Sequence, residues 1–213
     1  MKIKKFILNP FQLNCYLYFD EASKKGIIID PGAYDESEEN IILNFINSNN
    51  IKIEYIINTH GHIDHILGNA FAKECFGAPL MMNSEDIFLL NNAPSQSAMF
   101  GLKNISSPNP DLNISDETIL YLSDTKIMFL HTPGHSPGGI CIIDHLNKNV
   151  FCGDLIFANS IGRTDLPGGD MDILLDSIYN KLFKECSDDY ILYPGHMEET
   201  AILNEKKYNP FLQ

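Results

Sequence analysis

The sequence predicts one domain of mixed α/β structure, in which two β-sheets pack together and helices lie outside them. Three observations support this prediction. Strand-like runs dominate both halves of the chain, a few helices intervene, and 213 residues suit one sizeable core but are too few for two full domains. We therefore expect residues 1–213 to form a single compact domain.

The first half of the chain contains short strand-like runs, each closed by Pro, Gly, Asp or Asn. They are KIKKFILN (residues 2–9), NCYLYF (14–19), GIIID (26–30) and IEYIIN (53–58). The last of these runs is apolar enough to be a buried strand, and it leads directly into a cluster of histidines.

Two helices are predicted between and after these strands. Asp35 followed by Glu38 resembles a capping box at the start of the helix that contains NIILNFIN (40–47). The apolar residues that we expect on one face of this helix are Ile41, Ile42 and Phe45. The run ILGNAFAKECFG (66–77) predicts a second helix, ended by its last glycine.

Residues 93–113 are rich in Pro, Ser and Asn and show no clear period, so we expect a long connection or lid. Strand and helix signals then return. They are TILYL (118–122), KIMFLH (126–131), GICIID (139–144), NVFCGD (149–154), the helical DMDILLDSIYNKLFKE (170–185) and YILYP (190–194).

The composition limits the partners of this chain. With 28 acidic and 15 basic side chains, its net charge of −13 repels nucleic acid phosphates and anionic lipids, so we expect neither as a partner. No apolar stretch approaches the roughly 18 residues that span a bilayer, and no signal peptide is apparent. Five cysteines without CxxC spacing favour buried thiols. We therefore expect a cytoplasmic protein.

Three of the seven histidines lie within the segment THGHIDHILG (59–68). His60 and His62 are two residues apart, so both imidazoles can converge on one ion. Asp64 and His65 follow where the helix begins and can point at a neighbouring position. Because crowded imidazoles usually hold something cationic, a metal ion is the natural candidate.

Three more candidate ligands follow strand-like runs, each beside a glycine that permits a tight turn. They are His135 in TPGHSPGG, Asp154 in CGDLIF and His196 in YPGHMEE. Histidine and aspartate without cysteine suit zinc, which is our first choice, or iron or manganese.

The complete set is too large for one tetrahedral ion, and two divalent metal ions per chain would use it fully. The predicted assignment is His60, His62 and His135 on the first ion, Asp64, His65 and His196 on the second, and Asp154 as the bridge between them.

The pattern THGHIDH, TPGH, GD and PGH resembles the metallo-β-lactamase superfamily of metal hydrolases. NCYLYF with IIIDPGA, GRTDLPGGD at 162–170 and the terminal YNPFL are similar to its single-domain glyoxalase II-like (hydroxyacylglutathione hydrolase-like) members. The resemblance runs almost end to end and is weakest over residues 84–113. It implies an α/β (α+β) fold, a four-layer αββα sandwich with the metals at one edge, and its ligand positions match every candidate named above.

The resemblance implies a metal-dependent hydrolase of a small anionic thioester, with S-lactoylglutathione, cleaved to lactate and glutathione, as the expected substrate. A metal-bridging hydroxide would be the nucleophile, and Asp64 and Asp154 the catalytic carboxylates. Arg163 matches the position where glyoxalase II enzymes place a cation against the substrate carboxylate. For this arginine, a surface ion pair with Asp165 or Asp170 is the alternative.

Other functions stay open from the sequence. A persulfide dioxygenase with one iron has the same fold, and its ligands would also be present here. An RNA-processing nuclease of the superfamily and a non-catalytic metal-binding module are further alternatives; the net charge disfavours the nuclease, and the complete ligand set disfavours the inactive module. Asp30 is either a hydrogen-bond partner of the ligand loop or a cap of the turn before Pro31. His131 and His145 match no ligand position.

Overall fold

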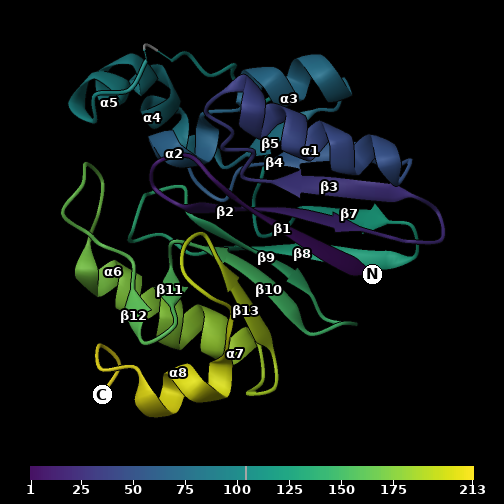
Figure 1. Ribbon diagram of the computed structural model, residues 1–213. Coiled ribbons are helices and arrows are strands. Elements are labelled where there is room, and N and C mark those ends of the chain that lie inside the picture. Colours follow the sequence, from purple (N-terminus) through teal and green to yellow (C-terminus); the bar gives the residue numbers. More distant parts are fainter. Residues whose placement is uncertain (104) are drawn as a thin grey trace. The chain divides into compact units, whose positions relative to one another are not determined.

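The computed structural model describes residues 1–103 and 105–213, and the chain forms two compact units, Met1–Asn113 and Ile114–Gln213. Each unit contains one six-stranded mixed sheet with helices against a face of it (Figure 1). The two predicted sheets are therefore present. A single domain over the whole chain stays a prediction.

The sheet of the Met1–Asn113 unit has the strand order β1-β2-β3-β4-β5-β6. Its strands are β1 (Lys2–Leu8), β2 (Leu13–Phe19), β3 (Lys25–Ile29), β4 (Lys52–Ile57), β5 (Leu80–Met82) and β6 (Leu112–Asn113). The first three pair antiparallel because short turns join them, whereas β3 to β6 pair parallel because longer, mostly helical connections link them. As predicted, β4 ends directly before the histidine cluster.

Helix α1 (Glu36–Ser48) begins at the predicted cap, where the Asp35 side chain accepts the Glu38 N–H group. The capping box is not completed as predicted, because the Glu38 carboxylate accepts the backbone N–H groups of Tyr34 and Asn9 instead. This carboxylate therefore ties the start of α1 to the turn between β1 and β2.

The buried face of α1 differs from the prediction by one position. Ile42 and Ile46 are buried and Phe45 packs against them, but Ile41 is 53% exposed. Side chains at i, i+3 and i+4 share a helix face, so Ile42, Phe45 and Ile46 form the stripe and Ile41 lies at its solvent edge.

The segment from β4 to β6 is more helical than predicted. Its elements are α2 (Ile63–Ile66), α3 (Asn69–Phe76), the 3₁₀ turn η1 (Ser84–Asp86), α4 (Ile87–Asn91) and α5 (Ala93–Met99). Gly77 ends α3 with a φ of 60°, as expected of a left-handed C-terminal residue.

Helix α5 corrects the prediction that residues 93–113 form an irregular connection. Pro94 lies in the first turn of α5, where no helical hydrogen bond needs its missing N–H group. The Ser97 hydroxyl donates to the Ala93 carbonyl at 2.8 Å, and both residues are buried. Burial of one face thus stabilises a helix that composition alone disfavours. The prediction for residue 104 lies outside the described residues.

The sheet of the Ile114–Gln213 unit has the order β14-β13-β10-β9-β8-β7. Its strands are β7 (Ile119–Leu122), β8 (Thr125–His131), β9 (Ile140–Asp144), β10 (Asn149–Gly153), β13 (Ile191–Pro194) and β14 (Thr200–Ala201), with a separate hairpin of β11 (Ile156–Phe157) and β12 (Ser160–Ile161). β10 and β13 pair parallel, so both strands end at the same edge of the sheet.

The helices of this unit cover one face of its sheet (Figure 1). The predicted helix 170–185 consists of α6 (Met171–Asp176), a π-helical segment (Ser177–Leu182) and α7 (Phe183–Glu185), and α8 (Ile202–Tyr208) follows β14. Asp170 caps α6 by accepting the Ile173 N–H group at 3.0 Å.

Each unit has its own hydrophobic core. Leu17, Ile28 and Ile56 are fully buried in the first, and Val150 and Leu192 in the second. Burying one such side chain stabilises the folded state by roughly 1.5 to 3 kcal/mol. The strands are therefore held rigidly, and so are the starting points of the loops at their ends. Among residues 1–103 and 105–213, no helix is both long and apolar enough to cross a membrane.

Candidate functional site

Four predicted ligands gather in the turn between β4 and α2, all within the Met1–Asn113 unit. His60 and His62 lie on the turn itself, whereas Asp64 and His65 lie in the first turn of α2. The ring centroids of His60 and His62 are 4.8 Å apart, and those of His60 and His65 are 3.9 Å apart. The sequence spacing therefore brings these side chains together as predicted.

These imidazoles are removed from water. His60, His62 and His65 are 2%, 6% and 0% exposed, and Asp64, with a side chain 14% exposed, borders the solvent. Placing several imidazoles and a carboxylate in so small a buried volume is costly unless they bind a common cation. Their nitrogen and oxygen donors fit a borderline divalent ion.

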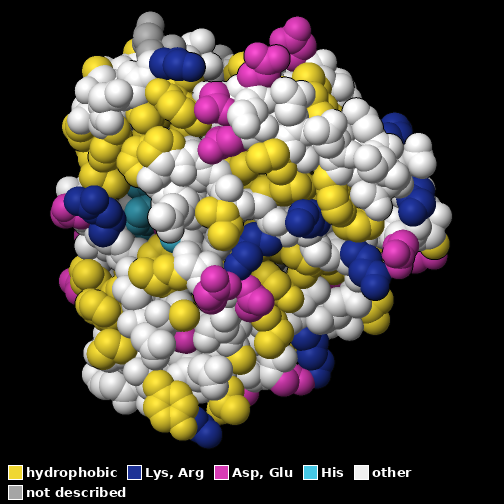
Figure 2. Space-filling model, viewed as in Figure 1, with side chains coloured by type: hydrophobic (Ala, Val, Ile, Leu, Met, Phe, Trp, Pro, Cys, Tyr) yellow, Lys and Arg dark blue, Asp and Glu magenta, His cyan; other side chains and the backbone are white. Residues whose placement is uncertain are grey.

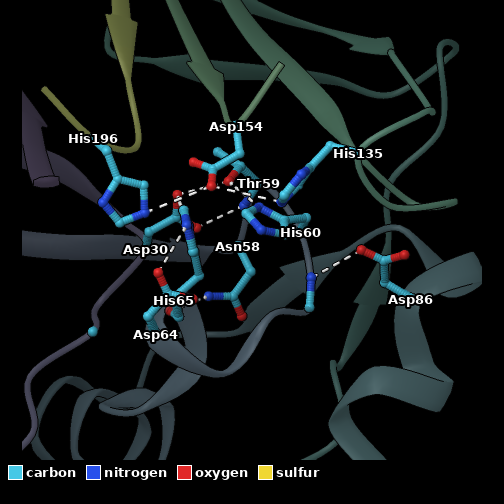
Figure 3. Close-up of polar contacts among 12 residues, drawn as sticks. Asp30, Asn58, Thr59, His60, Asp64, His65, Asp86, His135, Asp154 and His196 are labelled. Atoms are coloured by element: carbon cyan, nitrogen blue, oxygen red, sulfur yellow. Dashed lines mark hydrogen bonds and ion pairs between the residues drawn. The ribbon is translucent and has the colours of Figure 1, made fainter. Parts of the chain in front are cut away.

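Asp30, at the end of β3, contacts this cluster directly. Its carboxylate accepts the backbone N–H and the hydroxyl of Thr59, both at 2.7 Å, and its Oδ2 lies 3.0 Å from Nδ1 of His65 (Figure 3). A carboxylate against Nδ1 orients the imidazole and leaves Nε2 for a metal. Of the two interpretations of Asp30, partnership with the ligand loop is the one that these contacts support.

The second cluster lies within the Ile114–Gln213 unit and contains the remaining three predicted ligands. Nε2 of His135 and Nε2 of His196 each lie 3.6 Å from Oδ2 of Asp154, which points between them (Figure 3). Asp154 follows β10 and His196 follows β13. Because these parallel neighbours end at one sheet edge, residues far apart in sequence arrive at the same place.

His135 is held by the loop that follows β12. Its Nδ1 lies 2.7 Å from the backbone carbonyl oxygen of Arg163. Because a carbonyl oxygen only accepts, Nδ1 carries the proton and Nε2 keeps its lone pair. This close approach depends on Gly162, where a Cβ atom would lie 1.9 Å from the Asp154 carbonyl oxygen and 3.2 Å from the His135 Cβ.

The Arg163 side chain forms the surface ion pair that the sequence left as an alternative. Its Nε and Nη2 donate to the two carboxylate oxygens of Asp165 at 2.6 and 2.7 Å. Hydrogen bonding from Arg163 lowers the pKa of Asp165 to about 2. The Arg163 side chain is 59% exposed and stays accessible to an anion from solvent. Asp170, the other candidate partner, caps α6.

The remaining two histidines hydrogen-bond to groups that are not candidate ligands. His131 Nε2 lies 2.8 Å from the Pro137 carbonyl oxygen, and His145 Nδ1 lies 2.7 Å from the Tyr190 hydroxyl. Both residues lie in the Ile114–Gln213 unit, and their contacts agree with the structural role that their sequence context indicates.

Four of the five cysteines are buried thiols rather than thiolate donors. Cys15, Cys141, Cys152 and Cys186 are buried, and burial raises the pKa of each thiol, to about 12 for Cys141 and Cys186. A protonated thiol is a poor metal ligand and a poor nucleophile. The described groups that could hold a metal ion therefore consist of imidazole and carboxylate side chains.

Three residues from distant segments contact the histidine turn and were not identified from the sequence. The Asp86 carboxylate accepts the Gly61 N–H group at 2.9 Å, Gln96 Oε1 accepts the Ile63 N–H group at 3.1 Å, and Asn9 Nδ2 donates to the Asp64 carbonyl at 3.0 Å. The partners are separated by 25, 33 and 55 positions in the chain. No local sequence pattern predicts such contacts.

Comparisons with known proteins identify the family of this chain. The family model described as Metallo-beta-lactamase superfamily matches residues 8–196. Hydroxyacylglutathione hydrolase GloC of Haemophilus influenzae is 39% identical over 214 residues, which cover 100% of this chain and 98% of that protein. Probable metallo-hydrolase YqgX of Bacillus subtilis is 30% identical, with 100% and 98% covered.

Solved structures show the same fold. BLEG-1 B3 metallo-beta-lactamase matches with a TM-score of 0.88 at 31% identity, covering 99% of each chain. TTHA1623 in a di-iron-bound form matches at 0.86 and 31%, covering 98% of this chain and 99% of that one. ETHE1 from Myxococcus xanthus matches at 0.80 and 22%, with 99% and 84% covered, which shows the fold alone. The predicted fold class is thereby confirmed.

Proposed function

Because the chain belongs to the metallo-β-lactamase superfamily, we propose that it is a divalent-metal-dependent hydrolase whose substrate is a small anionic thioester. The observation that carries this proposal is the donor set: five histidines and two aspartates lie in the segments that follow strands, in two clusters of imidazole and carboxylate. The similarity over the full chain to a hydroxyacylglutathione hydrolase supports the thioester, with S-lactoylglutathione as the first candidate.

We propose that the two clusters together hold two metal ions. His60, His62 and His135 would bind one, Asp64, His65 and His196 the other, and Asp154 would bind both; each of these triples offers three ligand atoms. Zinc is the first choice for such donors. The di-iron form of TTHA1623, 31% identical to this chain, makes iron the next metal to test.

The metal ions, when bound, would supply an activated water as nucleophile and would polarise the thioester carbonyl. The Asp64 carboxylate, at the solvent border of its cluster, would accept a hydrogen bond from the attacking water and orient it. The carbonyl of Arg163 would hold His135 in the Nδ1-protonated form throughout. A thiolate, whose conjugate acid has a pKa of roughly 8.5, leaves without a proton donor, so no general acid is required.

Arg163 is proposed to bind the carboxylate of the substrate. A guanidinium grips a carboxylate with two parallel hydrogen bonds, and Arg163 already makes such a pair with Asp165. The substrate would therefore replace Asp165 on the same donors. Giving up the exposed pair with Asp165 costs under about 1 kcal/mol, which is less than the contact with the substrate carboxylate is expected to contribute.

Nucleic acid is not part of this proposal. On the face shown in Figure 2, Lys and Arg side chains are interspersed with Asp and Glu. Together with the net charge of −13, this distribution favours a small substrate over a polyanion. A cytoplasmic location, in which glutathione thioesters would be met, is part of the proposal.

The experiment that tests the function measures thiol release from S-lactoylglutathione by protein loaded separately with zinc, manganese and iron. We expect metal-dependent release with a kcat/KM of roughly 10⁴ M⁻¹s⁻¹ or more. Two parallel assays test the alternatives: hydrolysis of a chromogenic β-lactam, and oxygen uptake with glutathione persulfide. A single iron per chain with oxygen uptake and no thiol release would replace the hydrolase by a persulfide dioxygenase.

A further inference from the structure

The backbone of the histidine turn is held by side chains from several elements of the Met1–Asn113 unit. Side-chain hydrogen bonds reach the backbone of five of the residues between 59 and 65. They are Thr59 N–H to Asp30, Gly61 N–H to Asp86, Ile63 N–H to Gln96, Asn9 to the Asp64 carbonyl and Asn58 to the His65 carbonyl. The turn is thus anchored by the protein along its length.

Asp86 holds the part of the turn that carries the first two histidines. Its carboxylate is fully buried and accepts the N–H group of Gly61, the residue between His60 and His62 (Figure 3). A Cβ atom on Gly61 would lie 2.9 Å from the Asp86 carbonyl oxygen and 2.9 Å from the Leu89 Cβ. The backbone between the two histidines therefore packs directly on η1 and α4 and has little freedom to shift.

Asn9 holds the part of the turn that carries Asp64. It lies in the β1–β2 turn with a φ of 53° and is 8% exposed. Its Nδ2 donates to the carbonyls of Gly32 and Asp64 at 2.9 and 3.0 Å. Its backbone N–H donates to Glu38 at 2.7 Å, which fixes the turn that presents the amide. Asn9 is thus hydrogen-bonded to Gly32, to Glu38 and to Asp64, the residue before His65.

We propose that Asp86 and Asn9 are positioning residues for different metal ions. Asp86 holds the backbone between His60 and His62, which would bind one ion, and Asn9 holds the backbone of Asp64, which would bind the other. This division rests on the proposed two-ion function. Partners one step behind the ligands commonly change metal affinity by about 10- to 100-fold.

The test measures zinc affinity by competition with a chromophoric chelator in two single-site backgrounds. Asp64→Ala removes a ligand of the second ion, and His62→Ala removes a ligand of the first. We expect Asp86→Ala to weaken zinc binding by about 10- to 100-fold in the Asp64→Ala background and not in the His62→Ala background. Asn9→Ala should show the opposite pattern.

Matched variants separate positioning from general stability. Asp144→Ala removes another buried carboxylate that accepts a backbone N–H group, that of Asn147. Asn50→Ala places alanine at the same φ of 53° on an asparagine outside the turn. Both controls should lower the thermal midpoint of the metal-free protein without changing zinc affinity. Asp86→Asn keeps an oxygen acceptor, should fold where alanine does not, and should weaken binding less.

Several outcomes would overturn the division of tasks. It is wrong if Asp86→Ala or Asn9→Ala weakens both backgrounds equally, or neither, or if the control variants weaken zinc binding as strongly. Failure of the underlying proposal looks different: the unmodified protein would then bind fewer than two zinc ions per chain, before any substitution at Asp86 or Asn9 is made.

Discussion

Nδ1 of His135 lies 2.7 Å from the backbone carbonyl oxygen of Arg163, so a candidate metal ligand is held by the backbone of the candidate substrate-binding residue. The guanidinium of the same residue points instead to Asp165. The two parts of Arg163 therefore have separable roles, and substitutions of its side chain leave the carbonyl in place.

Arg163→Ala should raise KM for the anionic thioester about tenfold and leave kcat nearly unchanged, because one charged contact worth roughly 1.4 kcal/mol is lost in ground and transition states alike. Metal content should be unaffected, since the carbonyl that holds His135 remains. Steady-state kinetics with metal analysis of the same samples checks both statements. An unchanged KM would mean that Arg163 does not bind the substrate.

Gly162→Ala, unlike Arg163→Ala, should weaken metal binding. The new Cβ atom would lie 1.9 Å from the Asp154 carbonyl oxygen, so the loop must move away from Asp154 and His135 together. Zinc affinity should fall at least tenfold, as for other disturbances of a ligand's support. Gly101→Ala is the control and should bind zinc normally, because a Cβ atom added there would meet no atom of the described residues within 4 Å. Equal affinities of the two variants would contradict this prediction.

Asp165→Asn should lower KM, because it removes the carboxylate that competes with the substrate for Arg163. A fall of a few-fold is expected for an exposed pair. Steady-state kinetics with the same thioester measures the change. If KM rises instead, Asp165 orients Arg163 rather than competing with the substrate.

The same ion pair has a defined pH dependence. The pKa of Asp165 is lowered to about 2 by Arg163, so the stability from this pair is present above the ordinary aspartate pKa of about 3.9 and is lost as the pH falls toward 2. Carboxyl chemical shifts measured by NMR should show Asp165 titrating near pH 2, and near its ordinary value in Arg163→Ala. Titration at the ordinary value in the unmodified protein would show that the pair does not form in solution.

Asp30→Asn should weaken both the fold and the metal site. The carboxylate accepts one hydrogen bond from Thr59 at each of its two oxygens and lies against Nδ1 of His65. An amide has one oxygen, so it can replace only one of these acceptors. We expect a loss of roughly 1 to 3 kcal/mol in unfolding free energy of the metal-free protein, measured in urea. Asp188→Asn, which removes an exposed partner of Lys206, should cost under about 1 kcal/mol. Equal costs would show that Asp30 is not a structural acceptor.

The ligand candidates were predictable because each follows a strand. A strand has a strong sequence signal, and the glycines beside His135, Asp154 and His196 mark the turns at strand ends. The parallel pairing of β10 with β13 then brings Asp154 and His196 to one edge. Local patterns thus indicate that each candidate follows a strand, and the pairing of the strands brings the candidates together.

The parts that could not be predicted depend on contacts between distant segments. The Glu38 carboxylate accepts a hydrogen bond from Asn9, which is 29 positions away, and not from its expected capping partner. Helix α5 forms where Pro and Ser suggested a loop. Asp86 reaches Gly61 across 25 positions. In each case contacts with distant segments override or add to the weak local preferences of the sequence.

The measurement that tests the central claim most directly is the metal content and thioester turnover of the unmodified protein beside Asp154→Ala. Asp154 is the residue that the proposed assignment shares between both ions. We expect two divalent ions per chain and metal-dependent thiol release in the unmodified protein, and loss of nearly all turnover with fewer than two bound ions in Asp154→Ala. An Asp154→Ala variant that keeps two metal ions and full turnover would contradict the two-ion hydrolase.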